Sequence, residues 1–562
     1  MNAVERLRTQ LERVAAELGV EGANAQLERP RNPYHGDLAT NLALMLAGRL
    51  RRPPREIAQA ILDRLVLANA GVARAEVAGA GFINFWLAGE VLHGQLARIV
   101  EQDRAYGRSE VGAGQPVMVE FVSANPTGPL HIGHGRQAAL GDAIAGLLAW
   151  TGWRAHREFY YNDAGEQIAR LTRSVWARYQ QLCGRDVAFP EDGYHGDYVV
   201  DVARDLRARD GDRWAGDESE AALEAMRKFA VAELRAEQNR DLAEFRVQFD
   251  EFFLESSLYD SGRVEKTIER LCETGLAYEH EGALWLRTTA FGDDKDRVMV
   301  KSNGQPTYFL PDVAYHLTKW ERGFHADINV QGADHHGTIA RMRAGLRALG
   351  LPEGYPEYVL HQMVLVMQGG QEVKFSKRAG SYTTLHELVT ETGVDVARYF
   401  FLMRRADAQM VFDLDLALDH SEKNPVYKVQ YAHARMWSIF RKAGVDPKDV
   451  DVGGADLALL SERTEQDLVK QLGQFPDLVA RAAEARAPHL VCDYLEETAG
   501  VVNSWYHAGN PSRNPELAVL VPDPALRAAR LVLARGIQIV LRNGLELLGL
   551  SAPERMEREE TA

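Results

Sequence analysis

The 562-residue sequence predicts an α/β protein in which a doubly wound parallel sheet lies between a small N-terminal α/β module and a C-terminal helical bundle. Two observations predict this architecture. Between about residues 107 and 420, short apolar runs typical of buried strands alternate with helical segments. Polar motifs follow these runs, and the ligand sites of doubly wound sheets likewise lie just after the strands. From about residue 421 onward helical periodicity dominates, ending in Leu541–Leu550.

Residues 1–106 form the predicted N-terminal module. Val4–Leu18 has the periodicity of an amphipathic helix, and Gly36–Asn41 is typical of the start of a second helix. Gly81–Leu87 has the composition of a strand. Together these segments predict a small α/β unit.

The parallel sheet is expected to begin at Val117–Val122, a short and mostly apolar run. A loop rich in Pro, Gly, Asn and Thr, Ala124–His134, leads from it into a helix over about His131–Trp150. Gly133 and Gly135 have no side chains, which lets another backbone or a flat base come close to the turn. Because the first N–H groups of a helix lack partners within it, this turn favours an anion and predicts a nucleotide site.

His131 and His134 are three residues apart and share one face of the first helical turn. Both imidazoles can donate to phosphate oxygens while charge develops at phosphorus, and neither needs to exchange a proton. The alternatives are two ordinary histidines at a helix start, or half of a metal site, although no cysteine or carboxylate with ligand spacing lies nearby.

A second motif, Lys374–Gly380, follows the apolar run Met363–Met367 and the turn Gln368–Gln371. Three cations within five residues form a solvated loop in most proteins. Beside the first motif, they could instead close over the β- and γ-phosphates and neutralise charge as pyrophosphate departs. The residues expected to contact these phosphates are Lys374, Ser376 and Lys377.

A long helical insertion is expected over about 167–260, because Asp201–Arg246 is highly charged and typical of exposed amphipathic helices. After it the chain returns to alternating strands and helices. The segments expected in this part are Leu284–Leu286, Val298–Val300, Tyr308–Asp312 and Ile328–Val330.

Composition limits the class of protein. No apolar run approaches the roughly 18 residues of a membrane helix, and the N-terminus has no apolar signal segment, which favours a cytosolic protein. Cys183, Cys272 and Cys492 are too far apart in sequence to indicate a zinc site or a disulfide framework. The net charge of −15 argues against a polyanionic partner, but local charge matters more than the total.

Residues 421–445 carry five basic residues and one acidic residue, in a segment that predicts a helix beginning after Asn424 with Pro425 in its first turn. A stripe with three-four spacing should face the core: Val426, Val429, His433, Met436 and Phe440. Outside this stripe, Lys428, Tyr431 and Arg435 could contact phosphates and stack on an unpaired base. A plain solvated helix face is equally consistent with the pattern.

The two motifs resemble the HIGH and KMSK signatures of the class I aminoacyl-tRNA synthetases, with Phe375 in place of the usual Met. Other segments resemble the bacterial arginyl-tRNA synthetases, and the likeness runs over about residues 1–556. These segments are Glu120–Asn125, Tyr160–Gly165, Tyr308–Asp312, Gly332–Gly337 and Ala552–Met556.

The resemblance implies ATP-dependent activation of L-arginine to arginyl-adenylate and its transfer to the 3′ end of tRNA(Arg), with ATP–Mg²⁺ as substrate and no tightly bound metal or organic cofactor. It implies a Rossmann-like catalytic domain at 107–420, a tRNA-contacting domain at 1–106 and an anticodon-binding domain at 421–562. A cytoplasmic monomer without membrane or DNA partners is expected. In this family, arginine activation requires bound tRNA.

The resemblance also assigns residues. A pocket for an arginine side chain needs carboxylate oxygens that pair with the forked guanidinium, and a flat side chain beside it. The positions that match the arginine-binding residues of the family are Glu120, Asn125, Tyr308 and Asp312. Asp312 could otherwise be a helix cap, and Glu120 could be paired with a nearby Arg. The ribose and adenine of ATP are assigned to Asp334 and His336, whose surroundings could alternatively bind a metal. Phe82 and Asn84 are expected to stack on and hydrogen-bond a tRNA base, or simply to belong to a packed strand.

Three other functions compete with this interpretation. A nucleotidyltransferase that adenylates a small acid would not need the N-terminal module or the helical C-terminal part. A non-catalytic tRNA-binding relative would lose the His or Lys pairs, which are intact here. A synthetase of another specificity would differ at Glu120, Tyr308 and Asp312.

Overall fold

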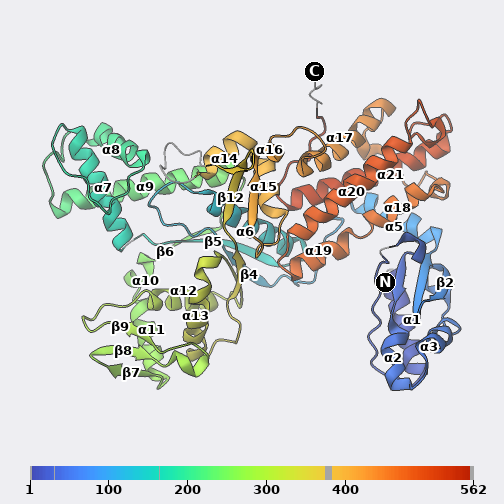
Figure 1. Cartoon of the computed structure of the whole chain (residues 1–562), viewed down its shortest axis with the longest axis horizontal. Helices are drawn as coiled ribbons and strands as arrows, with labels where there is room; N and C mark the ends of the chain where they lie inside the picture. The colour runs from blue at the N-terminus through green and yellow to red at the C-terminus, as the bar shows by residue number, and fades with distance from the viewer. Residues whose placement is uncertain (1–2, 31, 164, 374–382, 557–562) are drawn as a thin grey trace.

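The computed structural model describes residues 3–30, 32–163, 165–373 and 383–556. Figure 1 shows the parallel sheet in the middle of the molecule, the N-terminal module projecting at one end, and the helices that follow β5 projecting at the other. Among the described residues, none of the helices combines the length and apolar character needed to traverse a bilayer.

The central sheet is five-stranded, parallel throughout, and ordered β11-β10-β4-β5-β6. Its strands are β4 Pro116–Glu120, β5 Arg154–Tyr161, β6 Glu251–Leu254, β10 Ala326–Gly332 and β11 Glu357–His361. From β4 in the middle, the chain first builds β5 and β6 on one side and later β10 and β11 on the other. The predicted doubly wound sheet is therefore confirmed, and its direction switches between β4 and β10, where such sheets bind ligands at their carboxyl edge.

Helices cover this sheet and connect its strands, with α6 packed against both β5 and β10. A small second sheet, ordered β13-β12-β14, lies beside α6. The elements of this part are α6 Ile132–Trp150, α12 Phe309–Glu321, α13 His336–Ala348, β12 Val364–Gln368, β13 Gln371–Glu372, α14 Leu385–Thr392, α15 Val394–Leu402, β14 Met410–Asp413 and α16 Leu414–Ala417.

The expected insertion differs from the structure at its end. Its helices α7, α8 and α9 share a hydrophobic core, but β6 and the short α10 follow within the predicted range, and β6 is the edge strand of the central sheet. A four-residue strand after long charged helices gives too short a pattern to recognise in sequence. The elements are α7 Glu166–Leu182, α8 Asp197–Asp210, α9 Glu220–Glu244, α10 Ser256–Asp260 and α11 Arg263–Glu273.

One further prediction is corrected after β6. β7 Ala277–His280, β8 Ala283–Leu286 and β9 Arg297–Val300 form a separate antiparallel sheet instead of joining the parallel one. Tyr308–Asp312, one of the segments expected to continue the alternation of strands and helices, begins α12, with Tyr308 at the N-cap. The backbone of Leu310 hydrogen-bonds Thr307, so the helical turn starts directly after the small sheet.

The N-terminal module has its own core and a three-stranded sheet ordered β1-β3-β2. The predicted first helix and last strand are confirmed, whereas Gly36–Asn41 contains β1, and the second helix begins after Asn41. The elements are α1 Ala3–Glu17, β1 Leu38–Thr40, α2 Leu42–Leu50, α3 Pro54–Leu62, α4 Leu67–Ala70, β2 Val72–Ala78 and β3 Phe82–Leu87. The next helix, α5 Gly89–Gln102, packs into the main hydrophobic core instead.

The C-terminal part is a helical bundle, as predicted, and α21 packs against α17, α18, α20 and α5. The Asn424 side chain caps α17 with Pro425 in the first turn, and all five residues of the predicted stripe are buried. The helices are α17 Pro425–Ala443, α18 Arg463–Leu472, α19 Phe475–Glu484, α20 His489–Ala508 and α21 Pro524–Leu547.

The central sheet contains a buried acid whose ion pair should make the fold sensitive to low pH. Burial opposes ionisation of Glu158, but hydrogen bonds from His156 and Arg322 and the nearby Lys319 outweigh it and lower its pKa to about 2. Because the folded pKa lies below the unfolded value of 4.5, the stabilisation is present above about pH 4.5 and is lost as the pH falls toward 2.

Glu158→Gln should therefore lower the free energy of unfolding by about 3 kcal/mol at pH 6, and by progressively less down to pH 2. Denaturant melts of both proteins across this range measure the difference. Glu56→Gln, at an exposed helical pair, should show no such trend. A Glu158→Gln effect that is constant with pH would contradict the assignment.

Candidate active site

The N-terminus of α6 lies at the switch point of the sheet, directly after β4 and its loop. His131 is its N-cap, and the Nδ1 atom accepts hydrogen bonds from the backbone N–H of Gly133 at 3.0 Å and of His134 at 3.3 Å. In return, His134 Nδ1 accepts from the His131 N–H at 3.3 Å. The two rings stack with centroids 3.6 Å apart. The predicted pair is thus a reciprocal capping box.

This arrangement sets the protonation of both imidazoles. Each Nδ1 accepts a backbone N–H, so in the neutral ring the proton is on Nε2. Burial lowers the pKa of His131 and, together with the neighbouring His131 and His361 rings, lowers that of His134 well below its ordinary value. Two neutral rings with Nε2–H donors therefore stand at the positive end of a helix, which suits phosphate binding without proton transfer.

The two glycines of this turn have different roles. A side chain at Gly133 would lie 2.8 Å from His131 Cε1, so glycine is needed for the cap itself. Gly135 is buried, and a side chain there would meet Leu385 at 2.7 Å and Phe401 at 3.1 Å. The missing side chain at Gly135 therefore serves helix packing, and the expected nucleotide contact at this glycine stays a prediction.

The chain that follows the second motif is joined to the first. Ile132 N–H donates to Thr383 O at 3.2 Å, and Leu385 N–H donates to Leu130 O at 2.8 Å, so the start of α14 is paired with the start of α6. Lys374, Ser376 and Lys377 themselves lie outside the described residues. The hydrogen-bonded anchor at Thr383 is six residues beyond Lys377 in sequence.

The turn after β10 faces the same region. The Asp334 carboxylate partly offsets the lowering of the pKa of His131 and of His361 by burial, whereas His336 is exposed in the first turn of α13. His361 ends β11, opposite Gly332 of β10, and its Nε2 is buried without a hydrogen-bond partner among the described residues. Burial lowers its pKa to about 4. Sequence reasoning did not find this third histidine.

Helices α8 and α9 hold the loop between β4 and α6. The buried Gln238 side chain donates to Asn125 O at 3.1 Å and to Gly128 O at 2.9 Å, and Tyr198 Oη donates to Thr127 O at 2.8 Å. The loop starts with an unfavourable backbone, since Val122 has φ +70° and so lies in the left-handed region that β-branched residues avoid. The surrounding structure fixes this turn, as is common at functional sites.

A group of acidic side chains lies near this loop, and we call it the acidic pocket. Asp312, in the first turn of α12, has no hydrogen-bond partner among the described residues, and burial together with the charges of Glu255 and Glu120 raises its pKa to about 7. Glu255, just after β6, accepts from Tyr160 Oη at 2.7 Å, and burial raises its pKa too. A bound cation would relieve both carboxyls. Tyr308, 72% exposed at the N-cap, lies at the start of the same helix.

Glu120 is already ion-paired within the protein, and its predicted contact with the substrate stays a prediction. One carboxylate oxygen accepts from the fully buried Lys319 at 2.6 Å and the other from Ser123 Oγ at 2.9 Å. Lys319 also contacts Asp327 at 3.1 Å and Asn329 at 3.0 Å. The expected partner was a substrate guanidinium or a nearby Arg, and the structure supplies a lysine from α12. Glu120 thus supports the pocket through a buried ion network.

Asn125, the fourth predicted substrate contact, is on the loop itself. Its amide donates to Gln167 Oε1 at 2.7 Å at the start of α7. The side chain is therefore already oriented by a neighbouring helix.

Three family models match consecutive parts of the chain. Residues 4–87 match the arginyl tRNA synthetase N terminal domain, residues 95–401 the class I (R) tRNA synthetase catalytic domain, and residues 429–556 the DALR anticodon binding domain. The chain belongs to the arginyl-tRNA synthetases. As a member of this family it is an arginine–tRNA ligase, which attaches arginine to tRNA.

Relatives agree with this arginyl-tRNA synthetase assignment over nearly the whole chain. The arginine–tRNA ligase of Thiobacillus denitrificans is 53% identical and covers 94% of this chain and 95% of its own. That of Bordetella petrii is 52% identical and covers 97% of each. The solved arginyl-tRNA synthetase of Thermus thermophilus superposes with a TM-score of 0.74 at 25% identity, over 98% of this chain and 100% of its own.

The tRNA contacts predicted for this synthetase are unequally accessible. Phe82 is 43% exposed on β3, but Asn84 is only 3% exposed, so only the aromatic member of that pair offers surface to a partner. Lys428 and Tyr431 are half-buried on α17. Arg435 is 6% exposed, bonded to Asn503 and Glu422. Its expected phosphate contact is therefore corrected to an internal ion pair.

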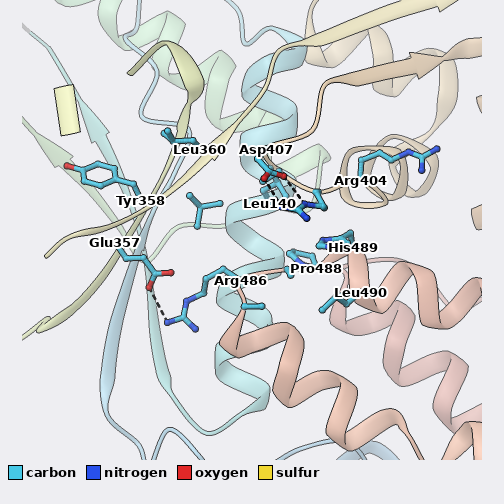
Figure 2. Close-up of a pocket in the computed structure, with 15 residues that line it drawn as sticks. Leu140, Glu357, Tyr358, Leu360, Arg404, Asp407, Arg486, Pro488, His489 and Leu490 are labelled. Atoms are coloured by element: carbon cyan, nitrogen blue, oxygen red, sulfur yellow. Dashed lines mark hydrogen bonds and ion pairs between the residues drawn. The ribbon is translucent and has the colours of Figure 1, made fainter. Parts of the chain in front are cut away.

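A cavity of about 490 Å³ lies away from the N-terminus of α6, between β11, the loop before β14 and the turn from α19 to α20 (Figure 2). Leu140, more than two turns along α6 from His131, contributes to its wall. Two pairs of charges on the wall are ion-paired, Arg486 with Glu357 at 3.2 Å and Arg405 with Asp407 at 2.8 Å. This cavity is a junction between the sheet and the helical bundle.

Proposed function

We propose that this arginyl-tRNA synthetase forms arginyl-adenylate at the N-terminus of α6, with ATP over the switch point and the arginine side chain in the acidic pocket. The observation that carries this proposal is the capped histidine pair. His131 and His134 present two neutral Nε2–H donors at a helix N-terminus, within a loop that also leads to the pocket. No other function considered from the sequence uses both features.

In the first step the arginine carboxylate attacks the α-phosphate of ATP–Mg²⁺ in line, and pyrophosphate leaves. The two imidazoles stabilise the developing charge, and the backbone at Gly133 lets the nucleotide approach the helix. Lys374, Ser376 and Lys377 contact the departing phosphates. Asp334 and His336 bind the ribose and adenine region; the effect of Asp334 on the pKa of His131 supports its proximity.

The guanidinium is held by Asp312, which lacks an ionic partner among the described residues, and by Glu255, the residue that sequence reasoning missed. Tyr308 supplies the flat neighbour by closing over the substrate, and Asn125 orients the α-amino or carbonyl group. A guanidinium is planar and always charged, so two carboxyls at raised pKa select it over neutral side chains of similar length.

In the second step a ribose hydroxyl at the 3′ end of tRNA(Arg) attacks the activated carbonyl, releasing AMP. Residues 1–106 contact the tRNA through Phe82, residues 107–420 carry the chemistry, and residues 421–562 read the anticodon arm with Lys428 and Tyr431 near the surface. The protein acts in the cytoplasm as a monomer, and arginine activation depends on bound tRNA.

One experiment tests reaction and specificity together. A total tRNA pool is charged with each of the twenty labelled amino acids, and pyrophosphate exchange is followed with and without tRNA. Esterification of arginine alone is expected, with exchange only when tRNA is present. Charging with another amino acid would overturn the pocket assignment, and full exchange without tRNA would overturn the dependence on tRNA.

Lys377→Ala should slow adenylate formation more than tenfold and leave the affinity for tRNA nearly unchanged, because the lysine neutralises charge only as pyrophosphate forms. Single-turnover kinetics and a tRNA-binding titration measure the two effects. An equal loss of tRNA binding would show that this residue docks the tRNA instead.

A further inference from the structure

A second group of metal-ligand side chains lies where α9 meets α14, outside the pocket described above. Asp241 and Glu244 are three residues apart on one face of α9, and His386 is the second residue of α14. His386 Nδ1 is 3.1 Å from Glu244 Oε2 and 3.9 Å from Asp241 Oδ1. One ligand atom from each of the three residues lies within 4.8 Å of the others.

Asp241 is the member of the cluster whose buried carboxylate is not fully satisfied by neighbouring side chains. Its side chain is more than nine-tenths buried, and Oδ2 has no hydrogen-bond partner among the described residues. Burial and the nearby charges of Glu237 and Glu244 raise its pKa to about 6. A buried carboxylate oxygen without a partner is costly. His386, 3.9 Å away, only partly compensates for this cost, so the arrangement favours a further cation.

We propose that Asp241, Glu244 and His386 bind a divalent transition-metal ion, with Zn²⁺ as the representative ion. Imidazole together with carboxylates suits such ions, whereas Mg²⁺ prefers oxygen ligands and water. Ligand atoms around a tetrahedral ion with bonds of about 2.0 Å lie about 3.3 Å apart. His386 Nδ1 and Glu244 Oε2, 3.1 Å apart, are already at this spacing, whereas Asp241 would have to move closer. His386 and Glu244 are half-exposed, so water can complete the coordination.

A similar group on the sheet shows what a satisfied cluster looks like. His156, Glu158 and Glu251 also gather within ligand distance, but Arg322 Nη2 donates to both carboxylates at 2.6 Å and approaches the His156 ring at 3.5 Å. A guanidinium already neutralises that site. No cation of this kind contacts Asp241 among the described residues, which is the difference that favours a metal at α9.

An ion at this position would join the two elements that support the catalytic turn. One turn before Asp241, Gln238 holds the loop at Asn125 and Gly128. At the other side, α14 starts next to Thr383, whose carbonyl accepts from Ile132 at the start of α6. The metal would therefore stabilise the contact between α9 and α14 without touching a substrate.

The test is a calorimetric titration of the metal-free full-length protein with Zn²⁺. One ion per chain is expected, with the affinity lowered at least tenfold in Asp241→Asn and His386→Ala. His280→Ala, which removes a histidine that is exposed and outside the cluster, should bind like the wild type. Zn²⁺ should also raise the Tm of the wild type and of His280→Ala, but not that of His386→Ala.

Circular dichroism of each variant without metal checks that it is folded, and Glu244→Gln provides a second, exposed substitution. Equal Zn²⁺ binding by His386→Ala and the wild type would overturn the proposal, as would the absence of stoichiometric binding by the wild type. If His386→Ala lowers the metal-free Tm and no protein binds Zn²⁺, the cluster is an ion pair only.

Discussion

Replacing His131 by asparagine is expected to slow arginyl-adenylate formation by about 100-fold or more while leaving the Tm unchanged. Asparagine is a strong N-cap residue and can accept the Gly133 and His134 N–H groups that His131 Nδ1 accepts now. Asparagine cannot place a hydrogen-bond donor at the position of the His131 Nε2–H group. Loss of one such donor typically costs about 10²–10³ in rate. Single-turnover adenylate formation and thermal melts measure the two quantities.

His131→Ala is the matched comparison, because it removes the cap as well as the donor. It should show the same loss of rate and, in addition, a loss of about 1 kcal/mol in stability. If His131→Asn retained the wild-type rate, the ring would serve only to begin α6, and the charge at phosphorus would have to be stabilised elsewhere.

Replacing Asp312 by asparagine is expected to raise the KM for arginine about 100-fold or more, with the KM for ATP nearly unchanged. The amide keeps the shape of the side chain but removes the charge that pairs with the guanidinium, and truncating one partner of a buried charge pair typically costs about 2–5 kcal/mol. Asp260→Asn, on the exposed end of the neighbouring α10, is the control. An equal rise in both KM values would indicate a structural defect instead.

The same carboxyl should make arginine binding depend on pH. Burial and the neighbouring carboxylates raise the pKa of Asp312 to about 7 in the free protein, so part of the population is protonated at neutral pH. Only the ionised form pairs with the guanidinium. Arginine affinity should therefore rise between pH 6 and 8, and this rise should be missing in Asp312→Asn. Equilibrium binding of arginine across that range gives the result.

Local sequence was sufficient to predict the local structure of the turn that we propose as the nucleotide half of the site. The strand, the loop with its glycines and the histidine pair occupy one continuous segment. Spacing alone therefore placed the two histidines on one helical turn. The same holds for the α17 stripe and its Asn424 cap, which depend on residues within a few turns.

The amino-acid half could not be predicted in the same way, because its residues meet only through the sheet. Glu255 follows a four-residue strand, and Lys319 reaches Glu120 across 199 positions of sequence. A pattern within one segment does not reveal such a partner. Arg435 is a second example of a partner that local spacing does not reveal. Helical spacing placed Arg435 outside the core stripe, but Asn503 of α20 covers and binds its side chain.

The support that α8 and α9 give to the loop between β4 and α6 bears on attempts to build a minimal fragment of this enzyme. The region at 167–260 resembles an appendage that could be excised, yet Gln238 and Tyr198 hold the loop, and β6 with Glu255 belongs to the sheet and the pocket. Shortening should spare this region, since a version lacking it would keep both signature motifs and lose the scaffold that aligns them.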